Sequence, residues 1–207
     1  MKGNGEKQLP DSGQPSPARP GRLHLIPVGL GPADPRHWLP PAVQQLAAGI
    51  QIYIAENAKT ARAFLKQIGT HHVLQSITIH TLGPRTRPGD IRQWLQPLSQ
   101  GQDIGLVSEA GCPAVADPGS AVVRMAHDLN VQVVPHVGPS SILLGLMASG
   151  LDGQRFSFHG YAPVEPAARA RQLRTWENLS RKLKQTQILI ETPYRNDAMY
   201  DTLLQTL

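Results

Sequence analysis

Short apolar runs alternate with segments of helical periodicity along the chain, and this alternation restricts the fold more than any other feature. We expect strands at residues 23–28, 50–55, 73–80, 104–108, 131–135, 155–159 and 187–191. Between them we expect helices at residues 40–48, 58–68, 90–98, 120–129, 140–149 and 167–184, and a last helix toward Leu207. Strands that alternate with helices form βαβ units, so the sequence predicts an α/β fold with a mostly parallel sheet.

The 207 residues allow one large domain or two small ones. Residues 1–21 are rich in Pro, Gly and Ser and lack an apolar run, which predicts a disordered tail without a signal peptide. The glycines near residue 150 interrupt the pattern, so we expect an N-terminal α/β domain at 22–149 and a smaller α/β domain at 150–207.

One cysteine and no membrane-length apolar run indicate a protein of the cytoplasm that does not bind membranes. Cys112 cannot form an intramolecular disulfide, and the sequence supplies no base that would make it a nucleophile. The eight histidines, His71 and His72 among them, show no metal-ligand spacing, so we expect no metal.

Four loops follow expected strands, at residues 29–32, 56–57, 108–113 and 138–141, and all but Glu56-Asn57 are rich in Gly, Pro or Ser. In an open parallel sheet such loops leave the same edge, where ligands bind. Glycine lacks Cβ and lets the backbone approach a flat ligand closely. The four loops together therefore predict a binding site.

A dinucleotide site is a weaker interpretation of the first loop. Asp34 stands where the third glycine of G-x-G-x-x-G belongs, and four prolines delay the next helix. Glu56 does resemble the acidic residue that binds a ribose diol. A phosphate-binding P-loop is excluded because no G-K-[ST] occurs.

The loop sequences resemble those of the tetrapyrrole methylase superfamily, from about Leu23 to the end of the chain. They are most similar to its branch of small-subunit ribosomal RNA 2′-O-ribose methyltransferases. The matching segments are Leu25-Ile-Pro-Val-Gly-Leu-Gly-Pro32, Ala55-Glu-Asn-Ala-Lys-Thr60, Val107-Ser-Glu-Ala-Gly-Cys-Pro-Ala-Val-Ala-Asp-Pro-Gly119 and Val133-Val-Pro-His-Val-Gly-Pro-Ser-Ser141.

This resemblance implies two α/β domains with S-adenosylmethionine between them, a homodimer, and methylation of ribosomal RNA. By position, it implies cofactor contacts from Gly31, Pro32, Ala110, Gly111, Cys112, Val115, Gly138, Pro139, Ser140 and Glu191. The chain departs from the family's pattern at Glu56-Asn-Ala-Lys-Thr60 and Thr81-Leu-Gly-Pro-Arg85, on the side of the methyl acceptor. The family also normally continues past Leu207, so the second domain is abridged or the chain is a fragment.

Three ionisable residues lie nearest the expected cleft and are candidates for the catalytic base: Glu56, Lys59 and Glu109. Asp117 is expected to cap the helix that starts near Ser120. The acceptor could also be a tetrapyrrole or another small molecule, and the chain could bind the cofactor without catalysis or be a nicotinamide-dependent dehydrogenase. The basic segment 169–184 favours RNA, although it could equally form a solvated face.

Overall fold

A computed structural model describes residues 19–207 and contains two parallel sheets. The expected tail falls mainly on residues 1–18, which lie outside the described residues. Gly21, at its end, is buried and donates its N–H to the Leu98 carbonyl at 2.7 Å.

The larger sheet has five strands in the order β3-β2-β4-β1-β5, and every neighbouring pair is parallel. The strands are β1 (Leu23–Leu25), β2 (Ile52–Ala55), β3 (Thr78–Thr81), β4 (Ile104–Val107) and β5 (Val133–Pro135). All five carboxyl ends therefore meet at one edge of the sheet. The α/β class and the parallel sheet expected from the sequence are confirmed.

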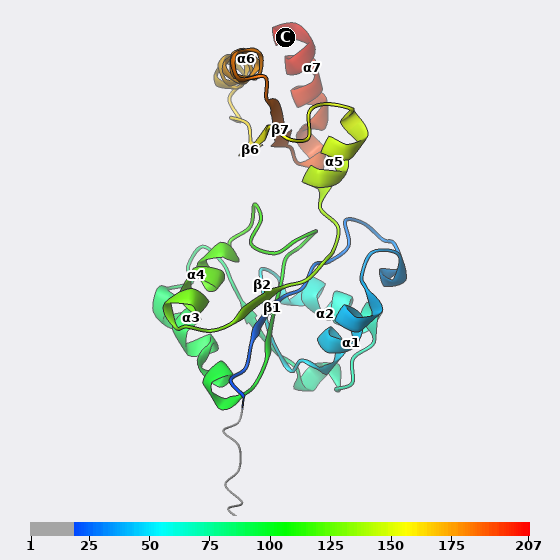
Figure 1. The fold of residues 1–207 in the computed structure, drawn as a ribbon, viewed down its shortest axis with the longest axis vertical. Helices are drawn as coiled ribbons and strands as arrows, with labels where there is room; N and C mark the ends of the chain where they lie inside the picture. Colours follow the sequence, from blue (N-terminus) through cyan, green and yellow to red (C-terminus); the bar gives the residue numbers. More distant parts are fainter. Residues whose placement is uncertain (1–18) are drawn as a thin grey trace, which may run out of the picture.

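Two helices cover each face of this sheet (Figure 1). On one face, α1 (Pro41–Gly49) and α2 (Ala58–Ile68) pack against Tyr53 and Ala55 of β2. On the other face, α3 (Pro88–Trp94) and α4 (Ser120–Asp128) pack against Ile54 of the same strand. Successive strand residues thus enter opposite cores, as the two-residue period of a strand requires.

The second sheet pairs β6 (Phe156–Tyr161) with β7 (Thr186–Ile190) in parallel. It lies with α5 (Ser141–Ser149), α6 (Pro166–Leu183) and α7 (Asn196–Thr206) in the upper part of the molecule (Figure 1). Leu173 and Trp176 of α6 pack with Met199 of α7 in a small core of their own. The domain limits at residues 149 and 150 stay a prediction.

Some element limits differ from expectation for local reasons. The residues expected to start the strand at 73 form instead the 3-10 turn η2 (Leu74–Ser76), and β3 begins only at Thr78. The helix expected at 90–98 starts at Pro88, which suits a first helical turn, and ends at Trp94. Pro97 then lies in η3 (Gln96–Gln100), since proline cannot continue an α-helix hydrogen-bond pattern.

Two further short turns complete the chain, η1 (Pro35–His37) and η4 (Pro193–Arg195). The strand expected at 23–28 ends at Leu25, shortly before Pro27, which has no N–H to pair. Within residues 19–207, none of the helices combines the length and the apolar character that crossing a membrane requires.

A substitution at Gly105 can test the packing of the central strands. It lies opposite Tyr53 across β2 and β4, and a Cβ at this position would fall 2.4 Å from Cε1 of the buried Tyr53 ring. We expect Gly105→Ala to destabilise the protein by about 1–3 kcal/mol, because overpacking forces neighbours to shift. Denaturant unfolding would measure this.

Gly89→Ala is the matched control, since nothing lies within 4 Å of the Cβ position of Gly89 in α3. We expect the control to be as stable as the parent or slightly more stable. Equal stability of Gly105→Ala and the parent would contradict the packing of β2 against β4.

Candidate functional site

A cavity of about 550 Å³ lies at the carboxyl edge of the large sheet. All four expected loops contribute to its wall: 29–32, 56–57, 108–113 and 138–141. The first loop, after β1, contributes Leu30 alone. The full lining is Leu30, Glu56, Ser108, Glu109, Ala110, Gly111, Cys112, Val115, Ala116, Asp117, Ser140, Ser141, Ile142, Tyr161, Ile190 and Glu191.

The loop after β4 is held against the loop after β1 by backbone hydrogen bonds. Gly111 and Val28 form an isolated antiparallel bridge, with N–H to carbonyl distances of 3.0 and 3.2 Å. Gly111 has φ of 71°, and a Cβ there would lie 3.3 Å from Leu30 Cδ2 and 3.4 Å from the Pro139 carbonyl oxygen. This position therefore favours glycine for both its conformation and its space.

The Cys112 thiol lies in the cavity wall, where its Sγ donates to the Pro139 carbonyl oxygen at 3.4 Å. Burial raises the pKa of this thiol, which keeps it protonated. Cys112 therefore links the loop after β4 to the loop after β5. Its protonated thiol is poorly suited to act as a nucleophile.

Asp117 holds the turn that closes the same loop. Its Oδ1 accepts the N–H of Ala114 at 2.8 Å and the N–H of Gly119 at 2.6 Å. Ala114 and Ala116 have φ of 66° and 56°, a conformation that L-residues rarely adopt. The expected capping role is thus only partly right, because Asp117 reaches the N-cap residue Gly119 but no N–H inside α4.

Three carboxylates line this cavity, and no ion pair joins them to a cation in the described part of the chain. Burial raises the pKa of Glu56, and the negative charges of Asp117 and Glu109 raise it further. Burial also raises the pKa of Asp117, although its two backbone hydrogen bonds oppose the shift. Glu109 accepts a hydrogen bond from the Thr60 hydroxyl at the start of α2. The cavity therefore has a strongly acidic side.

The second sheet supplies Tyr161, Ile190 and Glu191 to the cavity, at or just after the ends of β6 and β7. Glu191 forms an ion pair with Arg195, whose guanidinium also donates to the Ala162 carbonyl at 3.2 Å. Burial alone would raise the pKa of Glu191, but donors from Thr192 and Arg195 lower that pKa. Glu191 is thus a neutralised carboxylate.

Of the predicted cofactor residues, the cavity gathers Ala110, Gly111, Cys112, Val115, Ser140 and Glu191. The other four lie outside its lining: Gly31, Pro32, Gly138 and Pro139. Gly31 and Pro32 are exposed. Gly138 packs on Pro27, where an added Cβ would lie 2.2 Å from the Pro27 Cβ, so glycine there allows the two loops to meet.

Of the predicted base candidates, Glu56 and Glu109 line the cavity and Lys59 does not. Lys59 is exposed in the first turn of α2. Tyr161 and Ile190 were not anticipated, although the rule that parallel strands present their carboxyl ends together applies to β6 and β7 as well.

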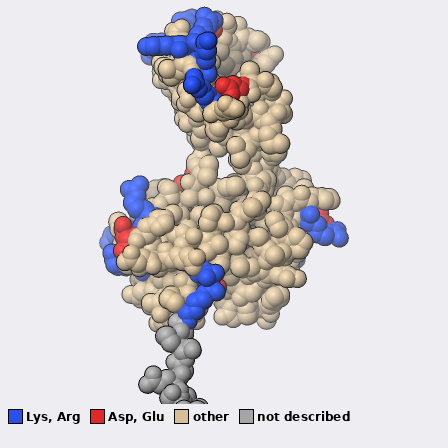
Figure 2. Space-filling model, in the orientation of Figure 1, with Lys and Arg blue, Asp and Glu red and all other residues tan. Residues whose placement is uncertain are grey.

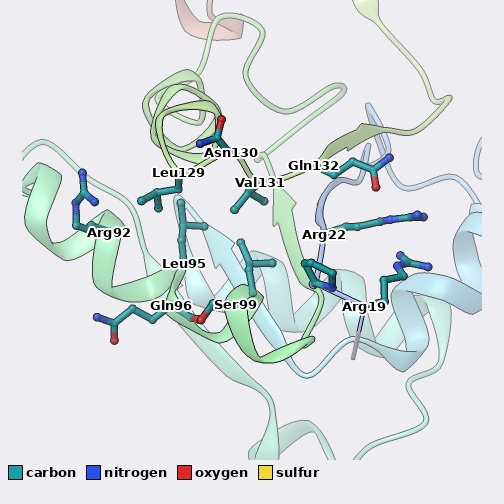
Figure 3. Close-up of a pocket in the computed structure, with 13 residues that line it drawn as sticks. Arg19, Arg22, Arg92, Leu95, Gln96, Ser99, Leu129, Asn130, Val131 and Gln132 are labelled. Carbon is teal, nitrogen blue, oxygen red and sulfur yellow. The ribbon is translucent and has the colours of Figure 1, made fainter. Parts of the chain in front are cut away.

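A second cavity, of about 690 Å³, lies near the opposite edge of the large sheet and contains none of the predicted residues. Figure 3 shows its apolar centre, where Leu95, Leu129 and Val131 approach one another. Arg19 and Arg22 extend together to one side, away from these apolar side chains.

The part of the chain that the structure describes contains no group of three or more His, Cys, Asp or Glu side chains placed to hold a metal ion. His24 Nδ1 and His136 Nε2 lie 3.0 Å apart, and His24 Nε2 lies 3.4 Å from Asp103. His24 is on β1, His136 directly follows β5 and Asp103 directly precedes β4, and none of the three lines the cavity. The expected absence of a metal stays a prediction.

Glu56, Glu109 and Asp117 form the acidic side of the cavity, called the acidic wall below. This wall predicts that the stability of the protein depends on pH. Because the pKa of Glu56 is raised in the folded protein, ionising Glu56 costs more there than in the unfolded chain. This cost is absent at a pH below the pKa that Glu56 has in the unfolded chain, and it is complete above the pKa that Glu56 has in the folded protein. We expect Glu56→Gln to raise the Tm by roughly 2 °C at pH 7.5 and to leave it unchanged near pH 4.

Glu165→Gln is the control with the opposite sign. Glu165 accepts the N–H groups of Ala167 and Ala168 at the start of α6, and these bonds lower its pKa. Its stabilisation is present above the unfolded pKa, so this variant should lower the Tm at pH 7.5. A Tm difference between Glu56→Gln and the parent that is the same at pH 4 and pH 7.5 would contradict this effect of the acidic wall.

The chain is similar to curated proteins named "Ribosomal RNA small subunit methyltransferase I". It is 33% identical to that of Xylella fastidiosa (strain Temecula1) over 160 residues, which cover 74% of this chain and 54% of the relative. It is 28% identical to the Pseudomonas aeruginosa protein, covering 84% and 58%, and 32% identical to the Synechocystis protein, also covering 84% and 58%.

No family model matches the chain. The chain spans about half the length of these curated relatives, which carry one name in three different organisms. The matched region covers most of this chain. The chain is therefore a homologue of proteins named ribosomal RNA small subunit methyltransferase I.

Proposed function

We propose that this chain is a tetrapyrrole methylase superfamily protein that binds S-adenosylmethionine and methylates a ribose 2′-hydroxyl of small-subunit ribosomal RNA. The observation that carries the proposal is the cavity at the carboxyl edge, where the loop 108–119 meets the loops after β1, β2 and β5. The name of the relatives supports methyl transfer and a small-subunit ribosomal RNA acceptor.

The cavity suits this cofactor in size and chemistry. A volume of about 550 Å³ is within the usual range for small-molecule sites. Leu30, Val115 and Ile142 offer apolar contacts, and Gly111 lets the backbone approach a ring closely. Ser140 is the N-cap residue of α5, and its side chain makes no capping hydrogen bond. Backbone N–H groups in the first turn of α5 therefore remain available for the carboxylate of the cofactor.

A dinucleotide fits the same cavity less well. Its pyrophosphate would meet Glu56, Glu109 and Asp117, and no Lys or Arg is among the lining residues to offset their charge. The turn after β1 also leads into η1 rather than directly into a long helix whose N-terminus could bind phosphate. These features favour a sulfonium cofactor over a nicotinamide dinucleotide.

The residues of this chain would align the reactants and accept a proton. Residues of the loop 108–119 and the first turn of α5 would hold S-adenosylmethionine, which would supply an activated methyl group on sulfur for transfer to the acceptor oxygen. The hydroxyl proton needs an acceptor, and Glu56 suits this role because it is partly buried and burial raises its pKa above the ordinary carboxyl value. Residues from both sheets form the walls of the cavity and would hold the reactants between them.

An exposed basic face on α6 supports an RNA acceptor. Arg171, Arg174, Arg181 and Lys182 recur at helical spacing on one side, and Lys and Arg gather there in Figure 2. Arg181 pairs with Glu177. Arg169, expected in the same basic segment, is instead buried with Leu173 and Trp176, and its Nε donates to Thr202 Oγ1 at 2.9 Å.

We also propose a homodimer. Three apolar side chains of α5 are at least half exposed: Leu143 at 52%, Leu144 at 50% and Met147 at 78%. Exposed apolar side chains that lie together on one helix favour a partner surface.

We expect S-adenosylmethionine and its demethylated product to bind at micromolar affinity, measured by isothermal titration calorimetry. Gly111→Val should abolish this binding while the fold persists, because the side chain would crowd Leu30 and Pro139 and strain the positive φ. Gly83→Val is the control, since nothing lies within 4 Å of its Cβ position. Absence of binding to the folded parent at millimolar ligand would refute the proposal.

RNA binding should weaken steeply with salt, because cationic side chains release counterions from phosphates. Replacing Arg171 and Arg174 with Ala should lower the slope of log affinity against log salt by about two and leave cofactor affinity intact. Filter binding with a small-subunit ribosomal RNA fragment at several salt concentrations would measure this slope.

Arg92→Ala with Arg124→Ala is the charge-matched control, because these exposed side chains lie on α3 and α4. This control should keep the parent's slope. If the α6 variant kept the parent's affinity and slope, the basic face would be a solvated surface, where exposed charges contribute little.

A further inference from the structure

The acidic wall of the cavity is unbalanced in charge. Four carboxylates line it, and none of its lining residues is Lys or Arg. Within residues 19–207, Glu191 alone among these carboxylates has a cation beside it, the guanidinium of Arg195. Glu56, Glu109 and Asp117 therefore present three negative charges when ionised, and the pKa of Glu56 is raised partly by the other two.

Asp117 holds its charge in a fixed place. Both of its hydrogen bonds use Oδ1, and Oδ2 has no hydrogen-bond partner within residues 19–207. Because two backbone N–H groups anchor the carboxylate, it cannot rotate away into solvent without breaking the turn at Ala114 and Ala116. A fixed, partly buried charge interacts with a ligand more strongly than a mobile exposed one.

We propose that Asp117, with Glu56 and Glu109, is a specificity determinant that makes the cavity prefer the positively charged methyl donor over its neutral, demethylated product. This inference rests on the proposed function. Methyl transfer converts a sulfonium into a thioether and so removes one positive charge from the bound molecule. The acidic wall no longer attracts the uncharged sulfur of the product, so the product binds more weakly than the donor and is released more readily.

The comparison between donor and product isolates this effect. Both molecules carry the same adenosine, ammonium and carboxylate groups, so contacts to Gly111 and to the first turn of α5 are common to both. Only the charge and methyl group on sulfur differ. For one carboxylate acting across a partly solvated cavity, we expect a change of about fivefold in relative affinity.

The test measures the ratio of the product's Kd to the donor's Kd by calorimetry, for the parent and for Asp117→Asn. Asparagine keeps an Oδ1 acceptor for Ala114 and Gly119 but removes the charge. The ratio should exceed one in the parent and fall about fivefold in Asp117→Asn, with the product's own Kd nearly unchanged. An analogue with an ammonium group in place of the methylsulfonium should behave like the donor.

Asp90→Asn is the matched control. Asp90 accepts the Arg87 N–H at the start of α3 and is not among the lining residues, so this change removes one charge elsewhere and should leave the ratio unchanged. Glu56→Gln with Glu109→Gln provides a second variant of the wall if Asp117→Asn does not fold. It should also lower the ratio.

The outcomes separate this inference from the function on which it rests. A ratio that stays constant in the wall variants, with both ligands still bound, would overturn the inference and leave the proposed function intact. A folded parent that binds neither ligand would overturn both. An equal fall of the ratio in Asp90→Asn would show a general charge effect and would also overturn the inference.

Discussion

The parallel pairing of the five central strands determines where a ligand can bind. Each strand's following loop leaves the sheet at the same edge, so segments as far apart in the chain as Leu30 and Ser140 lie around one cavity. The two cores on opposite faces of the sheet support this arrangement, because Tyr53 and Ile54 of one strand each fill a different core. Helices that cover both faces leave this edge free for the loops.

The loop between Ser108 and Gly119 turns this edge into a shaped and charged site. Its backbone is held by the bridge from Gly111 to Val28 and by the carboxylate of Asp117. The same loop provides close backbone approach at one end and a fixed negative charge at the other. These two features support the proposed affinity for a flat, partly apolar ligand and the proposed preference for positive charge.

Residues with a clear local signal were predictable from the sequence. Helix α2 has the expected limits, because Asn57 accepts the Lys59 N–H at its start and Gly69 takes a positive φ at its end. The start of β3 was missed, since Leu74 and Ile77 have the same apolar character in a 3-10 turn as in a strand. Arg169 belongs to the basic segment 169–184 expected to contact RNA, although its spacing with Leu173 and Trp176 indicates the buried face of α6. Tyr161 was missed because its role depends on how the two sheets are placed, which no local pattern reports.

Hydrogen exchange with and without S-adenosylmethionine tests the central claim most directly, because it locates the ligand without assuming catalysis. The account predicts slower exchange in residues 108–117, 140–142 and 190–191, which belong to the cavity at the carboxyl edge. Slower exchange confined to residues 95–99 and 129–132, around the cavity shown in Figure 3, would contradict it.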